Sequence, residues 1–143
     1  MAKRTGPSRA QGFATTRAAH ADEIAEDYVE AIADVIRESG ECRVRDLAPM
    51  MGVSHVTVVR TIKRLVEQGL VETERSRPIR LTPRGKLLAQ RSRHRHQVVL
   101  GFLLAIGVPS RQAQIDAEGI EHHASDATIR AMGRLQERLE GER

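Results

Sequence analysis

The segment from residue 43 to residue 69 constrains the fold most tightly, because it holds two short helical patterns joined by one turn. Gly52 permits a positive φ at this turn, and Ser54 is suited to cap the helix that follows. Apolar residues recur at helical spacing on both sides, and those predicted to be buried are Leu47, Ala48, Met51, Val56, Val59, Ile62, Leu65 and Val66. Two short helices joined by a tight glycine-containing turn form a helix-turn-helix, which predicts a DNA-binding unit.

A predicted β-hairpin follows this unit. Residues 70–73 and 79–82 alternate apolar and polar side chains, and residues 74–78 between them contain two arginines. A hairpin beside a recognition helix is a wing, and arginines at its tip typically contact backbone phosphates. The polar groups of the second helix and the wing are therefore the candidate DNA contacts: Ser54, His55, Thr57, Arg60, Thr61, Arg64, Arg75 and Arg77.

The charge distribution favours the same kind of partner. The net charge is only +4, but residues 54–95 carry eleven basic and three acidic side chains, whereas residues 20–53 carry three basic and nine acidic ones. A basic segment between acidic flanks is typical of a nucleic-acid-binding protein, although a solvated basic face gives the same pattern. No apolar run approaches the roughly 20 residues of a membrane span, no secretory signal is recognisable, and the lone Cys42 suits a cytoplasmic protein.

The remaining patterns are helical. An apolar stripe predicts a helix over residues 21–39, and Thr82 followed by Pro83 marks the start of a long helix that can run to Ile106. Ser110 and Ser125 are suited to cap two further helices. We therefore expect a mainly α fold with a disordered basic tail (residues 1–20), an N-terminal winged helix-turn-helix with a small β-hairpin wing (21–88) and an all-helical second domain (89–143).

Acidic and imidazole groups gather on one predicted helix face near the C-terminus. Glu118, Glu121 and His122 occupy positions i, i+3 and i+4, which lie on the same side of a helix. This arrangement is half of a divalent-metal site. Such side chains also occur on helices that simply face water, so the pattern needs support from other segments.

Two other segments supply further candidate ligands. Asp27 and Glu30 form a second carboxylate pair, and the long fourth helix carries His94 and His96, of which only one can face a given partner. Carboxylate oxygens with one or two imidazoles and no sulfur suit Mn²⁺ best and Fe²⁺ next. Four carboxylates gathered without a cation repel one another, so a bound metal would clamp the first helix against the second domain.

Three stretches of the sequence resemble the manganese transport regulator branch of the diphtheria-toxin-repressor family. They are Glu-Asp-Tyr-Val-Glu (26–30), Arg-His-Gln-Val-Val (95–99) and Ala-Glu-Gly-Ile-Glu-His-His (117–123), and the similarity extends from about residue 22 to residue 139. The resemblance implies a homodimeric, metal-activated repressor whose helical second domain binds metal and dimerises. The ligand positions that it implies are Asp27, Glu30, His96, Glu118, Glu121 and His122, which favours His96 over His94.

The sequence and this resemblance together predict a Mn²⁺-responsive repressor of manganese uptake and homeostasis genes that binds a palindromic double-stranded operator. We expect one or two Mn²⁺ ions per subunit, with Fe²⁺ as the alternative ion, and neither a membrane partner, a small organic ligand nor enzymatic activity. An iron-responsive or broadly divalent regulator of the same family is the alternative. A metallohydrolase and a winged-helix sensor of an organic ligand are hypotheses from other classes, and no separate general acid supports the hydrolase.

Overall fold

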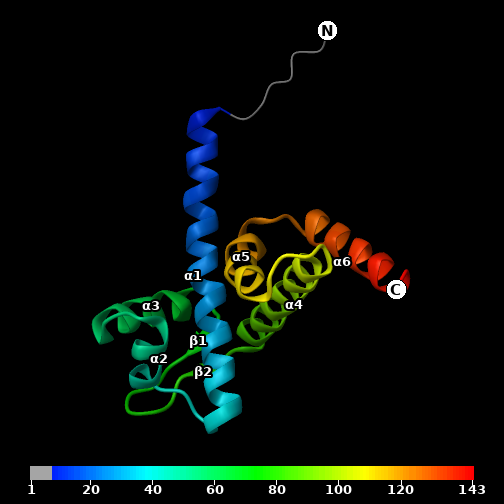
Figure 1. Cartoon of the computed structure of the whole chain (residues 1–143). Helices are drawn as coiled ribbons and strands as arrows, with labels where there is room; N and C mark the ends of the chain where they lie inside the picture. Colours follow the sequence, from blue (N-terminus) through cyan, green and yellow to red (C-terminus); the bar gives the residue numbers. More distant parts are fainter. Residues whose placement is uncertain (1–7) are drawn as a thin grey trace.

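The computed structural model describes residues 8–143, and the side chains of all but residues 12–19 among them. These residues form six helices and one antiparallel hairpin, arranged as in Figure 1. The elements are α1 (Arg9–Ser39), α2 (Val44–Met51), α3 (His55–Glu67), β1 (Val71–Glu72), β2 (Arg80–Leu81), α4 (Pro83–Ala105), α5 (Ser110–His123) and α6 (Asp126–Gly141). In residues 8–143 no helix is long and apolar enough to span a bilayer. The mainly α fold with a small hairpin is therefore confirmed.

Helix α1 begins earlier than the sequence predicts. The disordered tail was predicted to reach residue 20, but α1 starts at Arg9, so that prediction is wrong for residues 9–20. Ser8 explains the early start, because its side chain accepts from the Gln11 backbone N–H while the Gln11 side chain accepts from the Ser8 N–H. The four alanines between residues 9 and 20 favour a helix, whereas Gly12, Thr15 and Thr16 do not, so the cap decides where the helix starts. Residues 1–7 of the predicted tail lie outside the described residues.

Helices α2 and α3 form the predicted helix-turn-helix. Helix α2 ends at Met51, and the residue after it, Gly52, caps it with a φ of 67°. Ser54 caps α3 by accepting a hydrogen bond from the Thr57 backbone N–H. The left-handed conformation at the turn favours glycine because any Cβ is strained there. The positive φ of Gly52 and the N-cap at Ser54 are therefore both as the sequence predicts.

The buried face of α3 differs from the prediction. Its buried residues are Val58, Ile62 and Leu65, whereas Val56, Val59 and Val66 are exposed. Residues 58, 62 and 65 form one i, i+4, i+7 stripe. Val59 and Val66 flank this stripe, and Val56 lies on the opposite face of the helix. The helical spacing of apolar residues could not distinguish the buried face from the exposed face, because valines occupy both.

The hairpin pairs Val71 with Leu81 and Glu72 with Arg80 in antiparallel register. Cys42 extends it by one bridge, in which its carbonyl accepts from the Ile79 N–H at 2.7 Å. Burial, reinforced by the nearby Asp46 carboxylate, raises the pKa of the Cys42 thiol to about 11. Cys42 is therefore a protonated core side chain at neutral pH.

Two hydrophobic cores share helix α4. The first core lies under α1, the helix-turn-helix and the hairpin, and it includes Ile32, Leu47 and Ala89. The second core lies between α4, α5 and α6 and includes Val99 and Ala117. Helix α4 runs without a break through the domain boundary predicted at residue 88, so the two units are joined by a rigid element.

Helices α4 and α6 start where the sequence predicts, and α5 starts one residue earlier than predicted. Thr82 caps α4 ahead of Pro83, and Ser125 caps α6. Ser110, predicted as a cap, is instead the first residue of α5, and Pro109 occupies the cap position. Because proline has a fixed φ and no N–H to satisfy, it fits just outside a helix as well as inside its first turn.

Replacing Gly85 by alanine is expected to lower the free energy of unfolding by about 2–3 kcal/mol, the cost of overpacking a close contact. A Cβ at this position would lie 2.0 Å from the carbonyl oxygen of Leu70, which is backbone and cannot turn away. Urea denaturation of the metal-free protein measures the change. Gly133→Ala is the control, because its Cβ would lie 3.5 Å from Val98 and only improve helix propensity. Equal stability of G85A and wild type would contradict the close contact.

Candidate metal centre

The six predicted ligands lie where α1, α4 and α5 meet. Helix α1 supplies Asp27 and Glu30, α4 supplies one histidine, and the C-terminal half of α5 supplies the rest. The structure brings five of the predicted ligands, together with Glu23, into two adjoining groups, and Glu121 of one group contacts His122 of the other. We call them the α4–α5 group, which consists of His96, Glu118 and Glu121, and the α1–α5 group, which consists of Glu23, Asp27 and His122.

The α4–α5 group is centred on a buried carboxylate. Nδ1 of His96 lies 2.7 Å from Oε2 of Glu121 and 3.6 Å from Oε1 of Glu118. The Glu121 side chain is only 2 % exposed, whereas that of Glu118 is 65 % exposed and forms the solvent side of the group. The other candidate histidine, His94, is exposed and lines a separate surface hollow with Arg37 and Gln97. The structure therefore places His96, and not His94, at the centre.

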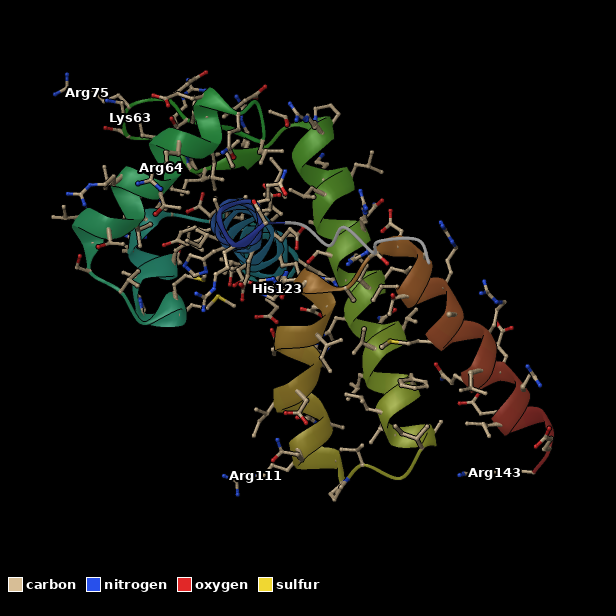
Figure 2. The ribbon with its side chains drawn as sticks, turned by 90° about the horizontal axis from the view of Figure 1, so that it is seen from above. Lys63, Arg64, Arg75, Arg111, His123 and Arg143 are labelled. Atoms are coloured by element: carbon tan, nitrogen blue, oxygen red, sulfur yellow. The ribbon has the colours of Figure 1, made fainter. Side chains whose placement is uncertain are left out.

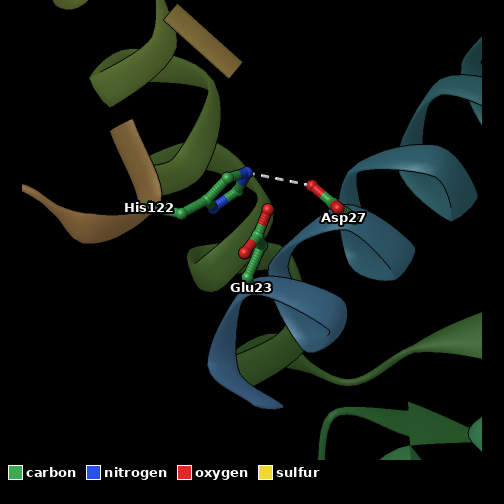
Figure 3. A group of neighbouring side chains, drawn as sticks. All are labelled: Glu23, Asp27 and His122. Atoms are coloured by element: carbon green, nitrogen blue, oxygen red, sulfur yellow. Dashed lines mark ion pairs between the residues drawn. The ribbon is translucent and has the colours of Figure 1, made fainter. Parts of the chain in front are cut away.

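The α1–α5 group joins the first helix to the second unit. Nε2 of His122 lies 3.0 Å from Oδ1 of Asp27 and 3.2 Å from Oε1 of Glu121. Figure 3 shows the side chains of Glu23 and Asp27 on α1 and of His122 on α5 converging on the same space. The two oxygens of Glu121 therefore face different groups, one toward His96 and the other toward His122.

Glu30 lies beside both groups. Its Oε1 is buried and makes no hydrogen bond of good geometry. Burial raises the pKa of Glu30, a contact with Ser92 opposes the rise, and the negative charges of Glu121, Glu118 and Asp27 add to it. Such mutual repulsion between carboxylates is relieved when a cation lies among them.

The electrostatics of the centre match a cation site. Burial and the Glu121 charge also raise the pKa of Glu118, against the opposing effect of His96. Burial disfavours a charged His122, but its contacts with Asp27, Glu121 and Glu26 outweigh this and raise its pKa to about 12. Without metal, the protonated His122 supplies the positive charge that the surrounding carboxylates stabilise. A metal ion that binds to His122 must displace this proton.

Several buried polar atoms of the centre lie close to one another without a well-aligned hydrogen bond, which also indicates a cation site. Among the described residues, the buried side-chain atoms that make no hydrogen bond of good geometry are Glu30 Oε1, Ser92 Oγ, His96 Nδ1, Glu121 Oε2 and His122 Nε2. Buried polar groups are normally paired, and buried charges are paired or bound to metals. Four of these five atoms belong to predicted ligands, so the residues present fit a divalent cation held by oxygen and nitrogen.

The predicted DNA-contacting side chains lie on the exposed side of the helix-turn-helix and on the wing. His55, Thr57, Arg60 and Arg64 are exposed on α3, and Thr61 is half-buried with its hydroxyl donating to the Thr57 carbonyl. Ser54 is occupied as the cap of α3. On the wing Arg75 is exposed, and Figure 2 shows it at the outer edge of this unit. Lys63 is a further exposed basic residue on α3, which the sequence prediction omitted. Arg77 is exposed and pairs with Glu74 at 3.2 Å.

Sequence comparison relates the chain to metal-dependent regulators. A family model for the iron dependent repressor, metal binding and dimerisation domain matches residues 82–141, and a MarR family model matches residues 31–78. The transcriptional regulator MntR of Escherichia coli is 50% identical over 121 residues, which cover 85% of this chain and 78% of the relative. The chain belongs to the MntR family. The MntR of Geobacillus thermodenitrificans is more distant, at 38% identity over 77% of this chain and 78% of the relative.

Solved structures of similar fold include members that bind metal. A manganese-dependent transcriptional repressor in complex with manganese is similar with a TM-score of 0.69 and 29% identity, over 78% of this chain and 52% of that one. The metal-dependent transcriptional regulator MtsR shares the fold with a TM-score of 0.72 at 24% identity, over 79% of this chain and 53% of that one. The chain thus spans about half the length of these solved structures.

Sequence reasoning missed three polar residues around the centre of this MntR-family chain. Oε2 of Glu26 lies 2.6 Å from Nδ1 of His122 and accepts its proton, and Oε2 of Glu23 lies 3.2 Å from Nε2 of His123. A signal for Glu23 was available, because residues 23, 27 and 30 share one face of α1 at i, i+4 and i+7. Arg95 was quoted only as part of a motif, yet its guanidinium donates to the carbonyls of Glu121 and Ala124 and holds the end of α5 in place.

Proposed function

We propose that the protein is a Mn²⁺-activated transcriptional repressor that binds a palindromic operator as a homodimer and controls manganese uptake and homeostasis genes. The observation that supports this most directly is the buried Glu121 carboxylate, which faces an imidazole with each of its oxygens. The donor set of oxygen and nitrogen without sulfur suits Mn²⁺. The names of the relatives and of the manganese-bound structure agree with this choice. Binding to chromosomal DNA places the protein in the cytoplasm.

We propose that each subunit holds two ions, one in each group. The α4–α5 group and the α1–α5 group each bring three ligand atoms within 4.8 Å of one another, and they have no member in common. Glu121 of the first group lies 3.2 Å from His122 of the second. A bound divalent ion supplies positive charge that offsets the repulsion among the carboxylates. Glu30, whose buried oxygen lacks a hydrogen bond, is available to complete either group.

The ligands couple metal binding to the position of the DNA-binding unit. Asp27 and Glu30 belong to α1, which packs in the core of the winged helix, whereas Glu121 and His122 belong to α5 in the second unit. A cation held by ligands from both units fixes one unit against the other. This couples metal binding to operator binding, and the coupling free energy sets how strongly the metal activates the protein. In a dimer this would set the separation of two α3 helices to the roughly 34 Å between successive major grooves.

Homodimerisation is proposed for the second unit. The matched family model describes residues 82–141 as a metal binding and dimerisation domain. This unit exposes large apolar side chains that a second copy would cover, namely Leu104, Ile106, Ile115 and Leu135.

Mn²⁺ is expected to strengthen operator binding by about 10- to 100-fold, the usual range of an allosteric coupling. Fluorescence anisotropy would follow the binding of a labelled duplex, selected from a random pool with the Mn²⁺-loaded protein, in Mn²⁺ and in excess chelator. Mg²⁺ at the same concentration controls for ionic strength. Equal affinity in Mn²⁺ and in chelator would rule out metal activation.

An iron-responsive regulator is the second candidate function, because the matched family model carries the description of an iron dependent repressor. The same duplex titrated with Fe²⁺ under anaerobic conditions distinguishes the two. Activation at lower Fe²⁺ than Mn²⁺ concentrations would assign the protein to iron.

A further inference from the structure

Glu23 faces the same space as two of the predicted metal ligands. It lies one helical turn before Asp27 on α1, and a ligand atom from each of Glu23, Asp27 and His122 lies within 4.8 Å of the others. Ligands held about 2.1 Å from one octahedral ion lie roughly 3 Å apart when adjacent and about 4.2 Å apart when opposite. Small side-chain rotations therefore bring all three groups to a common ion (Figure 3).

We propose that Glu23 is a further metal ligand, which binds the ion of the α1–α5 group together with Asp27 and His122. This inference rests on the proposed metal-activated function. It adds one residue outside the set of six that the sequence and its resemblance indicated. It also extends the metal contact of α1 by one turn toward its N-terminus.

The His122 ring supports this site independently of the acidic residues. The side chain is only 1 % exposed, and its Nε2 is buried without a hydrogen bond of good geometry while it faces Asp27 at 3.0 Å. The other ring nitrogen, Nδ1, lies 2.6 Å from Oε2 of Glu26. A carboxylate on the far nitrogen of a metal-binding histidine fixes the ring and leaves the near nitrogen free to coordinate. Glu26 is thus a positioning residue for His122.

Charge and donor type also favour the inclusion of Glu23. The α4–α5 group offers two carboxylates and one imidazole, and Glu23 gives the α1–α5 group the same donor set. Two carboxylates neutralise one divalent cation, so Glu23 and Asp27 together balance the charge of this ion while Glu121 serves the α4–α5 group. An oxygen-rich set of this kind favours Mn²⁺ over softer ions.

The present partners of Glu23 do not prevent coordination. Its Oε2 lies 3.2 Å from Nε2 of His123 and 3.7 Å from Nδ1 of His20. The His20 side chain is 70 % exposed and that of His123 is 47 % exposed, and ion pairs open to solvent contribute little net stability. The carboxylate is therefore free to turn toward the ion, with His123 or His20 donating to its second oxygen.

Glu23→Gln is expected to weaken the binding of one Mn²⁺ ion by about 10- to 100-fold, the usual effect of changing a group close to a metal, and to leave the other ion in place. Isothermal titration calorimetry of the full chain with MnCl₂ gives both affinities, and electron paramagnetic resonance of free Mn²⁺ counts the bound ions. Asp22→Asn is the matched control, because Asp22 is the neighbouring residue, is exposed and lies outside both groups. Circular dichroism without metal checks that each variant keeps its helices.

The outcomes separate this inference from the proposed function. Two ions in wild type and in D22N, with one weakened in E23Q, would support Glu23 as a ligand. Two ions with wild-type affinities in E23Q, or the same loss in D22N, would overturn the assignment of Glu23 and leave the metal centre intact. Failure of the wild-type protein to bind Mn²⁺ would overturn both.

Discussion

Glu121→Gln is expected to abolish the response to Mn²⁺ while leaving the metal-free fold intact. Its two oxygens face the imidazoles of His96 and His122, so the amide removes a negative charge from both groups at once. Wild type at a Mn²⁺ concentration 100 times the dissociation constant gains about 2.7 kcal/mol, which corresponds to a rise in Tm of roughly 5 °C or more. The variant is expected to show almost none of this rise, because its affinity for Mn²⁺ falls by at least about 100-fold. At the same Mn²⁺ concentration it is expected to lose most of the roughly 10- to 100-fold activation of operator binding.

The stability of E121Q without metal distinguishes a metal ligand from a residue that only stabilises the fold, because replacing a structural residue would lower that stability. A buried carboxylate without a cation is unfavourable, so E121Q without metal is expected to be as stable as wild type or more stable. Thermal denaturation with and without Mn²⁺ measures both effects. Glu137→Gln is the control, because Glu137 is exposed on α6 away from the centre. If E121Q gains as much stability from Mn²⁺ as wild type, Glu121 does not hold the metal.

Arg60→Ala is expected to weaken operator binding by about 10- to 100-fold, because a guanidinium that forks onto guanine contributes about 1–3 kcal/mol of discrimination. Arg60 is exposed on the outer face of α3. In Mn²⁺, the affinity for the selected duplex is expected to fall much more than the affinity for an unrelated duplex. The ratio of the two affinities, which measures sequence specificity, therefore decreases. Anisotropy titrations with both duplexes measure this ratio.

Two further variants test the location of the DNA surface. Arg75→Ala on the wing removes a phosphate contact, so it is expected to weaken binding to both duplexes equally. The slope of log affinity against log salt concentration is expected to fall by about one, because one counterion fewer is released. Arg111→Ala removes the same charge from the start of α5, which Figure 2 shows far from the helix-turn-helix. An R111A protein that loses as much affinity as R60A would move the DNA surface to the second unit.

Local signals in the sequence predicted the element types well. The bounds of α2, the cap of α3 and the hairpin between residues 70 and 82 follow from glycine, serine and proline placement, which acts over a few residues. Two predictions failed for the same reason. The start of α1 depends on a reciprocal cap between Ser8 and Gln11, and the buried face of α3 depends on which side of the helix packs against α2 and β1.

The sequence by itself determined the chemistry of the metal centre. Helical spacing placed Glu118 with Glu121 and His122, and Asp27 with Glu30, because positions three and four apart share a helix face whatever the rest of the chain does. It could not determine how these faces meet, since the distances between α1, α4 and α5 depend on how the two hydrophobic cores pack around α4. Only the tertiary structure chose His96 over His94 on geometric grounds, aimed the two oxygens of Glu121 at different histidines and brought Glu23 beside His122.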